Sequence, residues 1–226
     1  LSSLNLEKYD EWKDDPNMIA DVMRFLDNVL SDFINKAPDQ FKDAKYSAER
    51  ERSVGLGVMG FHSFLQKKRI PLESVMAKSW NKKIFKQIDE QVNKASKDLA
   101  EERGACPDAA EYGFKERFSN KTAIAPTASI SIICGGASPG VEPIAANSYT
   151  HKTLSGSFNV RNRYLEEILE SHGKNDDETW STITTNQGSV SHLDFLTDLE
   201  KDVFKTAFEL NQKRIIEISA DRTPYI

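Results

Sequence analysis

The sequence predicts a helix-rich α/β fold, and three observations lead to that prediction. Apolar residues recur at helical spacing in three long segments, residues 16–37, 72–102 and 195–220. A short strand-like stretch, residues 122–125, comes directly before a turn at Pro126. The chain has 226 residues, of which 38% are hydrophobic, and this is enough to bury a sizeable core.

The first helical segment, residues 16–37, has boundary signals at both ends. Asp14 or Asp15 can cap its start, Pro16 suits the first turn, and Pro38 ends it. The residues that follow, 39–53, are polar and charged. A run of charges is typical of a solvated face, so we predict a solvated connector there.

Residues 55–60 form the string G-x-G-x-x-G, which is the fingerprint of dinucleotide binding. That motif requires a buried strand before its first glycine, whereas residues 48–54 are mostly charged. Two interpretations stay open: a site for a nucleotide pyrophosphate, and glycines that let the helix beginning at Phe61 approach a neighbour closely. The charged context favours the second.

The second helical segment, residues 72–102, is followed by Gly104, which suits the position just past a last helical turn. The two cysteines, Cys106 and Cys134, come later in the chain. Neither has a Cys or His at metal-ligand spacing, so no metal site is predicted. We predict that both are small buried hydrophobic side chains rather than nucleophiles.

Residues 122–141 carry no charge, although 29% of the whole chain is charged. Pro126 and several Ser and Thr residues argue against a membrane segment. Two interpretations of this window are equally supported by its pattern. Its hydroxyls and free backbone amides can bind an anion, or the window is a buried strand–turn–strand of small residues.

The remainder of the chain adds further elements. Residues 147–162 are polar and aromatic, residues 164–171 and 195–220 are predicted helices, and residues 173–178 are a predicted loop. The histidines are predicted to be surface or packing residues rather than catalytic ones: His62, His151, His172 and His192.

Charge and composition exclude several classes of function. The net charge of −5 and the absence of a long basic block argue against binding to nucleic acid. No run of 18 apolar residues exists, so no membrane span is predicted. Two cysteines suit a reducing cytoplasm. The chain begins at Leu1 and ends at Ile226 straight after a helical pattern, so we expect a single fragment, residues 1–226, of a larger protein.

Several motifs, in order, resemble the large (alpha) subunit of class I ribonucleoside-diphosphate reductase. The main one is N-K-T-A-I-A-P-T-A-S-I at residues 120–130, followed by G-V-E-P at 140–143 and T-L-S-G at 153–156. Further landmarks are R-S-V-G-L-G-V-M-G at 52–60 and E-R-G-A-C-P at 102–107. The opening L-S-S-L-N-L is also similar, so the resemblance covers essentially the whole chain.

The resemblance implies a fold, a reaction and partners. The fold is part of the ten-stranded α/β barrel of ribonucleotide reductase, whose two five-stranded parallel halves run antiparallel to each other. The reaction replaces the 2′-hydroxyl of a ribonucleoside diphosphate with hydrogen by cysteine thiyl-radical chemistry, and so supplies DNA synthesis. A diiron small subunit delivers the radical, thioredoxin or glutaredoxin supplies electrons, and ATP or deoxynucleotides act as effectors. The large subunit itself needs no metal or other cofactor for this chemistry.

The catalytic residues of that family match positions outside this chain. The radical cysteine, with its Asn and Glu, lies upstream of Leu1, and the relay tyrosines follow Ile226. Tyr225 does not match those tyrosines, and neither Cys106 nor Cys134 matches a catalytic cysteine. We therefore place no catalytic residue here and expect the chain to be inactive without the remaining large-subunit segments.

The part of the family's site that does match is the loop for the substrate diphosphate. Its residues in this chain are Thr127, Ala128, Ser129 and Ile130. The resemblance implies that backbone amides and two hydroxyls at a helix N-terminus hold the diphosphate. Ser131 is a weaker candidate, and Leu1 is a further possible contact. The alternative is a non-catalytic helical interaction module whose Gly-rich loop contacts a protein partner.

Overall fold

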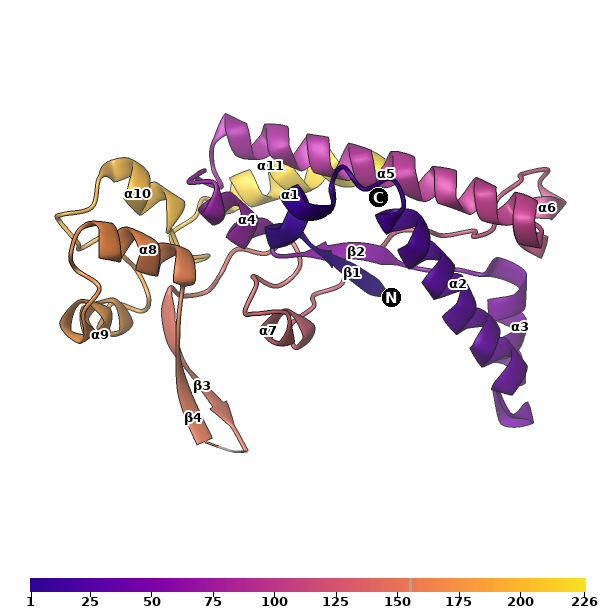
Figure 1. Cartoon of the computed structure of the whole chain (residues 1–226), viewed down its shortest axis with the longest axis horizontal. Coiled ribbons are helices and arrows are strands. Elements are labelled where there is room, and N and C mark those ends of the chain that lie inside the picture. Colours follow the sequence, from indigo (N-terminus) through magenta and orange to yellow (C-terminus); the bar gives the residue numbers. More distant parts are fainter. Residues whose placement is uncertain (155) are drawn as a thin grey trace.

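The computed structural model describes residues 1–154 and 156–226, and Figure 1 shows its helices arranged around a short parallel sheet. The helices and strands are β1 Ser2–Asn5, α1 Tyr9–Trp12, α2 Met18–Lys36, α3 Lys42–Glu51, β2 Leu56–Met59, α4 Phe61–Lys67, α5 Val75–Arg103, α6 Pro107–Glu111, α7 Ile130–Ile133, β3 Ser148–Thr153, β4 Gly156–Arg161, α8 Arg163–Ser171, α9 Asp177–Thr185, α10 Asp198–Val203 and α11 Gln212–Arg222. Short 3-10 turns occur at Leu6–Lys8, Asp39–Phe41 and Thr223–Tyr225.

The sheet is built from β1, β2 and a third segment that follows them at residues 120–123. β1 and β2 pair in parallel, with Ser2 opposite Leu56. Leu56 also forms a parallel bridge with Thr122, and its N–H donates to the carbonyl of Lys121 at 2.9 Å. The predicted α/β fold is confirmed, whereas the described part of the chain contains no closed barrel.

The glycine string forms strand β2 and not a phosphate-binding turn. Helix α3, rather than a buried strand, precedes it, so the dinucleotide-binding interpretation is wrong. A Cβ added to Gly57 would lie 2.2 Å from the carbonyl oxygen of Ala123, far inside van der Waals contact. Glycine therefore permits a close approach, as the other interpretation expected, but the neighbour is the backbone of Ala123 and not another helix.

Helices α2 and α5 confirm the first two helical predictions. Ser74 caps the start of α5 by accepting a hydrogen bond from the N–H of Ala77, and Gly104, with φ of +88°, follows the last residue of the helix. Helix α2 packs on α5 through Met23 and Leu26. In the described ranges no helix is both long and apolar enough to cross a membrane.

The buried apolar side chains form two separate cores. The first core joins α2, α4, α5 and the parallel sheet. The second joins α8 and α9 to the segment 190–204, with Trp180 and Phe204 fully buried in it. The hairpin β3–β4 projects from the molecule between these two parts (Figure 1). The junction of the two cores is where the candidate site lies.

The prediction of a solvated connector at residues 39–53 is confirmed in part. The segment is largely exposed, but most of it is helix α3 and not an irregular connector, and some of its charged side chains bind neighbouring elements. Arg50 forms ion pairs with Asp108 and Glu111 of α6. Arg52, just past the end of α3, is buried against α2.

The single helix predicted for residues 195–220 is wrong, because local caps divide it. Thr197 forms a capping box with Glu200 that starts α10, which ends at Phe204. Residues 205–210 are not helical, and Asn211 caps a separate helix, α11. The predicted loop at 173–178 is shorter than expected, since Asp176 caps α9.

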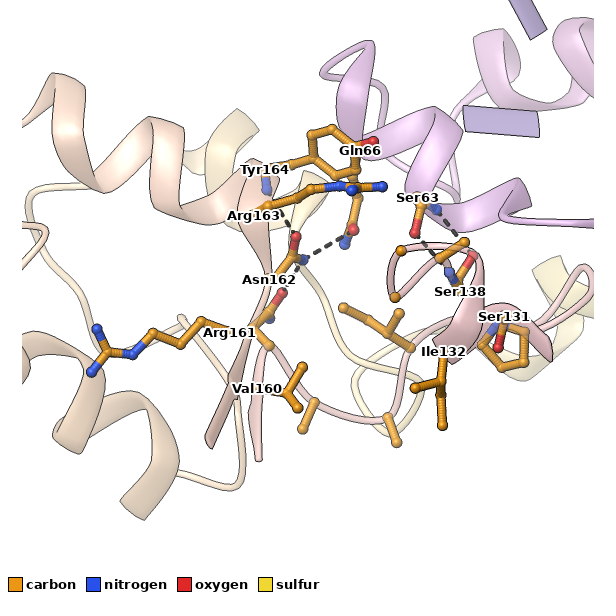
Figure 2. Close-up of a pocket in the computed structure, with 18 of the residues that line it drawn as sticks. Ser63, Gln66, Ser131, Ile132, Ser138, Val160, Arg161, Asn162, Arg163 and Tyr164 are labelled. Atoms are coloured by element: carbon orange, nitrogen blue, oxygen red, sulfur yellow. Dashed lines mark hydrogen bonds between the residues drawn. The ribbon is translucent and has the colours of Figure 1, made fainter. Parts of the chain in front are cut away.

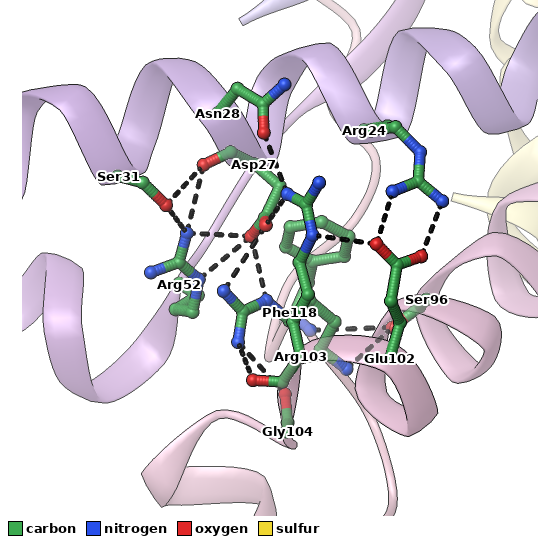
Figure 3. A network of polar contacts seen from close by, with 11 residues as sticks. Arg24, Asp27, Asn28, Ser31, Arg52, Ser96, Glu102, Arg103, Gly104 and Phe118 are labelled. Carbon is green, nitrogen blue, oxygen red and sulfur yellow. Dashed lines mark hydrogen bonds and ion pairs between the residues drawn. The ribbon is translucent and has the colours of Figure 1, made fainter.

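The buried carboxylate of Asp27, on α2, joins four segments that surround the first core (Figure 3). Its side chain is fully buried and accepts hydrogen bonds from Arg52 at 2.7 Å, from Arg103 at 2.8 Å and from Arg117 at 2.9 Å. Burial would raise the pKa of Asp27, but the bonds from the three arginines outweigh it and lower that pKa. The carboxylate therefore stays charged and joins α2 to the ends of α3 and α5 and to the segment before residue 120.

We predict that Asp27→Asn destabilises the chain by about 3–5 kcal/mol, because it leaves buried guanidinium groups without their counter-charge. Urea unfolding measures this loss. The control is Asp32→Asn on the same helix, where an exposed pair with Lys36 contributes at most about 0.5 kcal/mol.

The stabilities of Asp27→Asn and Asp32→Asn should also depend differently on pH. A lowered pKa at Asp27 stabilises the folded state above pH ~4, and this contribution is lost as the pH falls through the folded-state pKa. In Asp27→Asn the free energy of unfolding should therefore fall less steeply as the pH is lowered into the acid range. If the two variants were equally stable, or if Asp27→Asn lost stability in acid as steeply as the unsubstituted chain, Asp27 would not be the counter-charge that stabilises this cluster.

Candidate functional site

The uncharged window leaves the sheet at Pro126 and makes a tight turn at Thr127. The φ of Thr127 is +53°, an uncommon value for a β-branched residue. Its buried hydroxyl accepts a hydrogen bond of 2.7 Å from the N–H of Gly140, which joins the two ends of the window. Gly140 has φ of +48° and passes close to the carbonyl of Ala125, so a side chain does not fit there. These contacts fix where the loop begins.

The backbone amides that follow the turn are available to a ligand. Helix α7 is a single turn, and Ser129 precedes it as the N-cap. The N–H groups of Ala128, Ser129 and Ile130 have no hydrogen-bond acceptor among the described residues. Successive unpaired amides attract anions through their fixed dipoles, and with only one turn of helix the macrodipole adds little.

The loop is open and not sealed, which argues against the buried interpretation of the window. Ala128, Ser129 and Ile130 are exposed, whereas Thr127 is buried and serves the turn. Residues 122–125 do lie beside the sheet, but α7 follows the turn in place of a second strand. The buried strand–turn–strand is therefore wrong, and the exposed amide loop remains.

A cavity of about 530 Å³ lies beside this loop, at the junction of the two cores (Figure 2). Ala128 lines it, together with Ser131 and the glycine-rich stretch 135–139. The opposite wall comes from the base of the β3–β4 hairpin and the start of α8, residues 160–164. Its size is typical of small-molecule sites. Of the four predicted residues, only Ala128 faces this cavity.

The charged lining of the cavity is Glu7, Arg161 and Arg163, none of which was predicted. Glu7 is buried and forms an ion pair with Arg163, and it accepts a hydrogen bond of 2.9 Å from the Tyr164 hydroxyl. Burial, followed by the charge of Glu7, raises the pKa of Tyr164 to about 12. Burial opposes the charge of Arg163, yet the bond to Glu7 raises its pKa. At neutral pH the Tyr164 hydroxyl is therefore protonated and the Arg163 guanidinium is charged.

The histidine and cysteine predictions have mixed outcomes. His62 is buried, its Nδ1 accepts a hydrogen bond from the N–H of Ile144, and burial lowers its pKa to about 4, so it is a neutral packing residue as predicted. Cys106 is buried as predicted. The prediction for Cys134 is wrong, because it follows α7 on the exposed loop.

Two more sequence landmarks can be placed. Residues 147–162 contain the antiparallel hairpin β3–β4, in which His151 pairs with Phe158. Of the T-L-S-G motif, Thr153 ends β3 and Gly156 begins β4, and Ser155 is outside the described residues. Leu1, a further candidate, is 84% exposed beside Gly55.

Comparison with known proteins identifies the family. The family model for the ribonucleotide reductase barrel domain matches residues 1–117 and 108–226, and the chain belongs to that family. The ribonucleoside-diphosphate reductase large subunit of Invertebrate iridescent virus 6 is 50% identical over the whole chain, and that of Invertebrate iridescent virus 3 is 44% identical. The alpha subunit of the Actinobacillus ureae class Id ribonucleotide reductase has the same fold, with a TM-score of 0.91 and 40% identity over 99% of this chain.

The match covers only part of each relative. The chain spans 24% of the first viral protein, 36% of the second and 41% of the Actinobacillus subunit. The resemblance inferred from the sequence motifs is therefore confirmed at the level of the family.

We predict that Thr127→Val lowers the free energy of unfolding by about 1–3 kcal/mol, because it leaves the buried N–H of Gly140 without an acceptor. Thr127→Ser is the matched control, since it keeps the hydroxyl, and it should lose less than half as much. Urea unfolding of both variants measures the difference. If Val and Ser were equally stable, the hydroxyl would not hold the turn.

Proposed function

We propose that this chain is part of the large subunit of a ribonucleoside-diphosphate reductase and supplies the loop that holds the substrate diphosphate. The barrel-domain family and the names of the relatives support the enzyme class. One structural observation carries the assignment of the loop: three consecutive exposed amides, at Ala128, Ser129 and Ile130, lack an acceptor among the described residues.

The loop suits this task because it binds through dipoles instead of charges. Its amides and the hydroxyl of Ser129 can donate to phosphate oxygens, while residues 122–141 carry no ionised side chain. The buried hydroxyl of Thr127 holds the turn that aims the amides. A diphosphate fixed here would position the ribose for reaction, where a displacement of about 1 Å can cost roughly a hundredfold in rate.

The remaining parts of the proposal concern the complete enzyme. The barrel is completed by the rest of the large subunit, and those segments contribute the radical cysteine and the reducing cysteine pair. A diiron small subunit supplies the radical, thioredoxin or glutaredoxin restores the thiols, and ATP or deoxynucleotides regulate the enzyme. We expect the complete enzyme to work in the cytoplasm and to convert ribonucleoside to deoxyribonucleoside diphosphates for DNA synthesis.

We predict that Ser129→Ala, in the complete enzyme, raises the KM for cytidine diphosphate about tenfold with a smaller change in kcat. The variant removes one hydrogen bond to a charged phosphate, which contributes about 1.5–3 kcal/mol. Combining it with Thr127→Ala should raise KM further. Steady-state kinetics of ribonucleotide reduction provides the measurement.

The control for these variants is Ser157→Ala, another exposed serine, on the hairpin strand β4. It should leave KM unchanged. Unchanged KM for Ser129→Ala and for the double variant would remove the loop from substrate binding. A chain that bound no nucleoside diphosphate even in the complete subunit would favour the alternative, a protein-interaction module.

A further inference from the structure

Arg163, in the lining of the cavity, has more hydrogen-bond donors than the protein uses. Arg163 places Nη2 on the carboxylate of Glu7, yet 48% of its side chain is exposed. A guanidinium has five N–H donors, so several remain available to a ligand. Its Nη1 lies 3.6 Å from where a Cβ would stand on Gly135, so glycine leaves the guanidinium open on the side of the glycine-rich stretch.

Glu7 fixes the orientation of this arginine. The Glu7 side chain is 2% exposed and its second oxygen accepts the hydrogen bond from Tyr164. The Arg163 guanidinium also lies 5.2 Å from the centre of the Tyr164 ring. A flexible side chain is therefore held in one place before a ligand arrives, which lowers the entropic cost of binding.

The other polar groups of the lining are already paired with one another (Figure 2). Ser63 and Ser138 each accept a hydrogen bond from the backbone N–H of the other residue. Asn162 donates to Gln66 at 3.0 Å and to Asn147 at 2.8 Å. A ligand would gain little from these paired groups, whereas Arg163 offers a charged group with free donors.

The second arginine of the lining, Arg161, binds residues of α9 and not Glu7. Figure 2 shows it extending away from the other labelled side chains. Its Nη2 donates to Asp177 at 2.7 Å, and its guanidinium lies 5.1 Å from the centre of the Trp180 ring. Arg161 is thus a matched control, because it has the same charge and lies on the same wall.

The rest of the wall is apolar. Ile132, Ile144, Val160 and the ring of Tyr149 face the same volume of about 530 Å³. An apolar body of the size of one or two rings fits such a space, and burying its surface contributes to affinity. A fully polar ligand would leave these side chains without a partner.

We propose that the cavity is a binding site for a small organic oxyanion, an apolar body that carries one phosphate or carboxylate. Arg163 binds the oxyanion through its planar fork of donors, and Glu7 is the residue that positions Arg163. The cavity borders the amide loop at Ala128, but Arg163 and Glu7 lie outside that loop, and the proposal does not depend on the proposed reductase function.

Isothermal titration of the full chain with phenyl phosphate, benzoate and phenol tests this site. Phenyl phosphate or benzoate should bind, and the tighter of the two identifies the ligand as a phosphate or a carboxylate. Phenol, which keeps the ring but lacks the charge, should bind at least tenfold more weakly. Arg163→Gln should weaken binding of the preferred anion about tenfold or more, whereas Arg161→Gln should change it less than threefold.

The role of Glu7 is tested by a double-mutant cycle. Glu7→Gln should weaken anion binding, but adding it to Arg163→Gln should cause no further loss, because it acts only through that arginine. Circular dichroism confirms that each variant is folded, and Arg163→Lys, which keeps the charge without the fork, gives an intermediate affinity. The proposal is overturned if neither anion binds at millimolar concentration, if phenol binds equally well, or if the two arginine variants lose the same affinity.

Discussion

The structure around the candidate site depends on how closely the segment 120–124 approaches strand β2. The carbonyl of Ala123 occupies the space where any side chain at Gly57 would stand. The hydrogen bonds of Leu56 to this segment set its register, so the turn at Thr127 begins at a fixed point. The sheet therefore fixes the position of the loop, and the hydrogen bond between Thr127 and Gly140 fixes its conformation.

The Asp27 cluster supports the same segment from its other end. Arg117 comes just before residues 120–124 and is bound to a carboxylate of α2, to which the ends of α3 and α5 are also bound. Ion pairing here adds to the apolar packing of α2 on α5 and connects both helices to the end of α3 and to Arg117. The loop can consequently be neutral and made of small residues, because the rigidity that holds its amides in place comes from the surrounding scaffold.

The sequence predicted those features that depend on local signals. Helices α2 and α5 have clear periodicity and end signals, and the neutral window contains an exposed loop, while its binding of an anion stays a prediction. The break between α10 and α11 was missed because apolar residues continue at helical spacing through it, although Thr197 and Asn211 are capping residues. The pairing of Glu7 with Arg163 could not be predicted from the sequence, since the two residues are 156 positions apart in the chain.

The two proposals assign different ligands to neighbouring regions. The amides of the loop would bind phosphate oxygens without a titratable group, whereas the proposed ligand of the cavity has one anionic group on an apolar body. A crystal structure of the complete large subunit with cytidine diphosphate bound is the most direct test of the loop. We expect phosphate oxygens to accept hydrogen bonds from the amides of Ala128, Ser129 and Ile130. A diphosphate bound elsewhere, with those amides still facing water, would contradict the assignment.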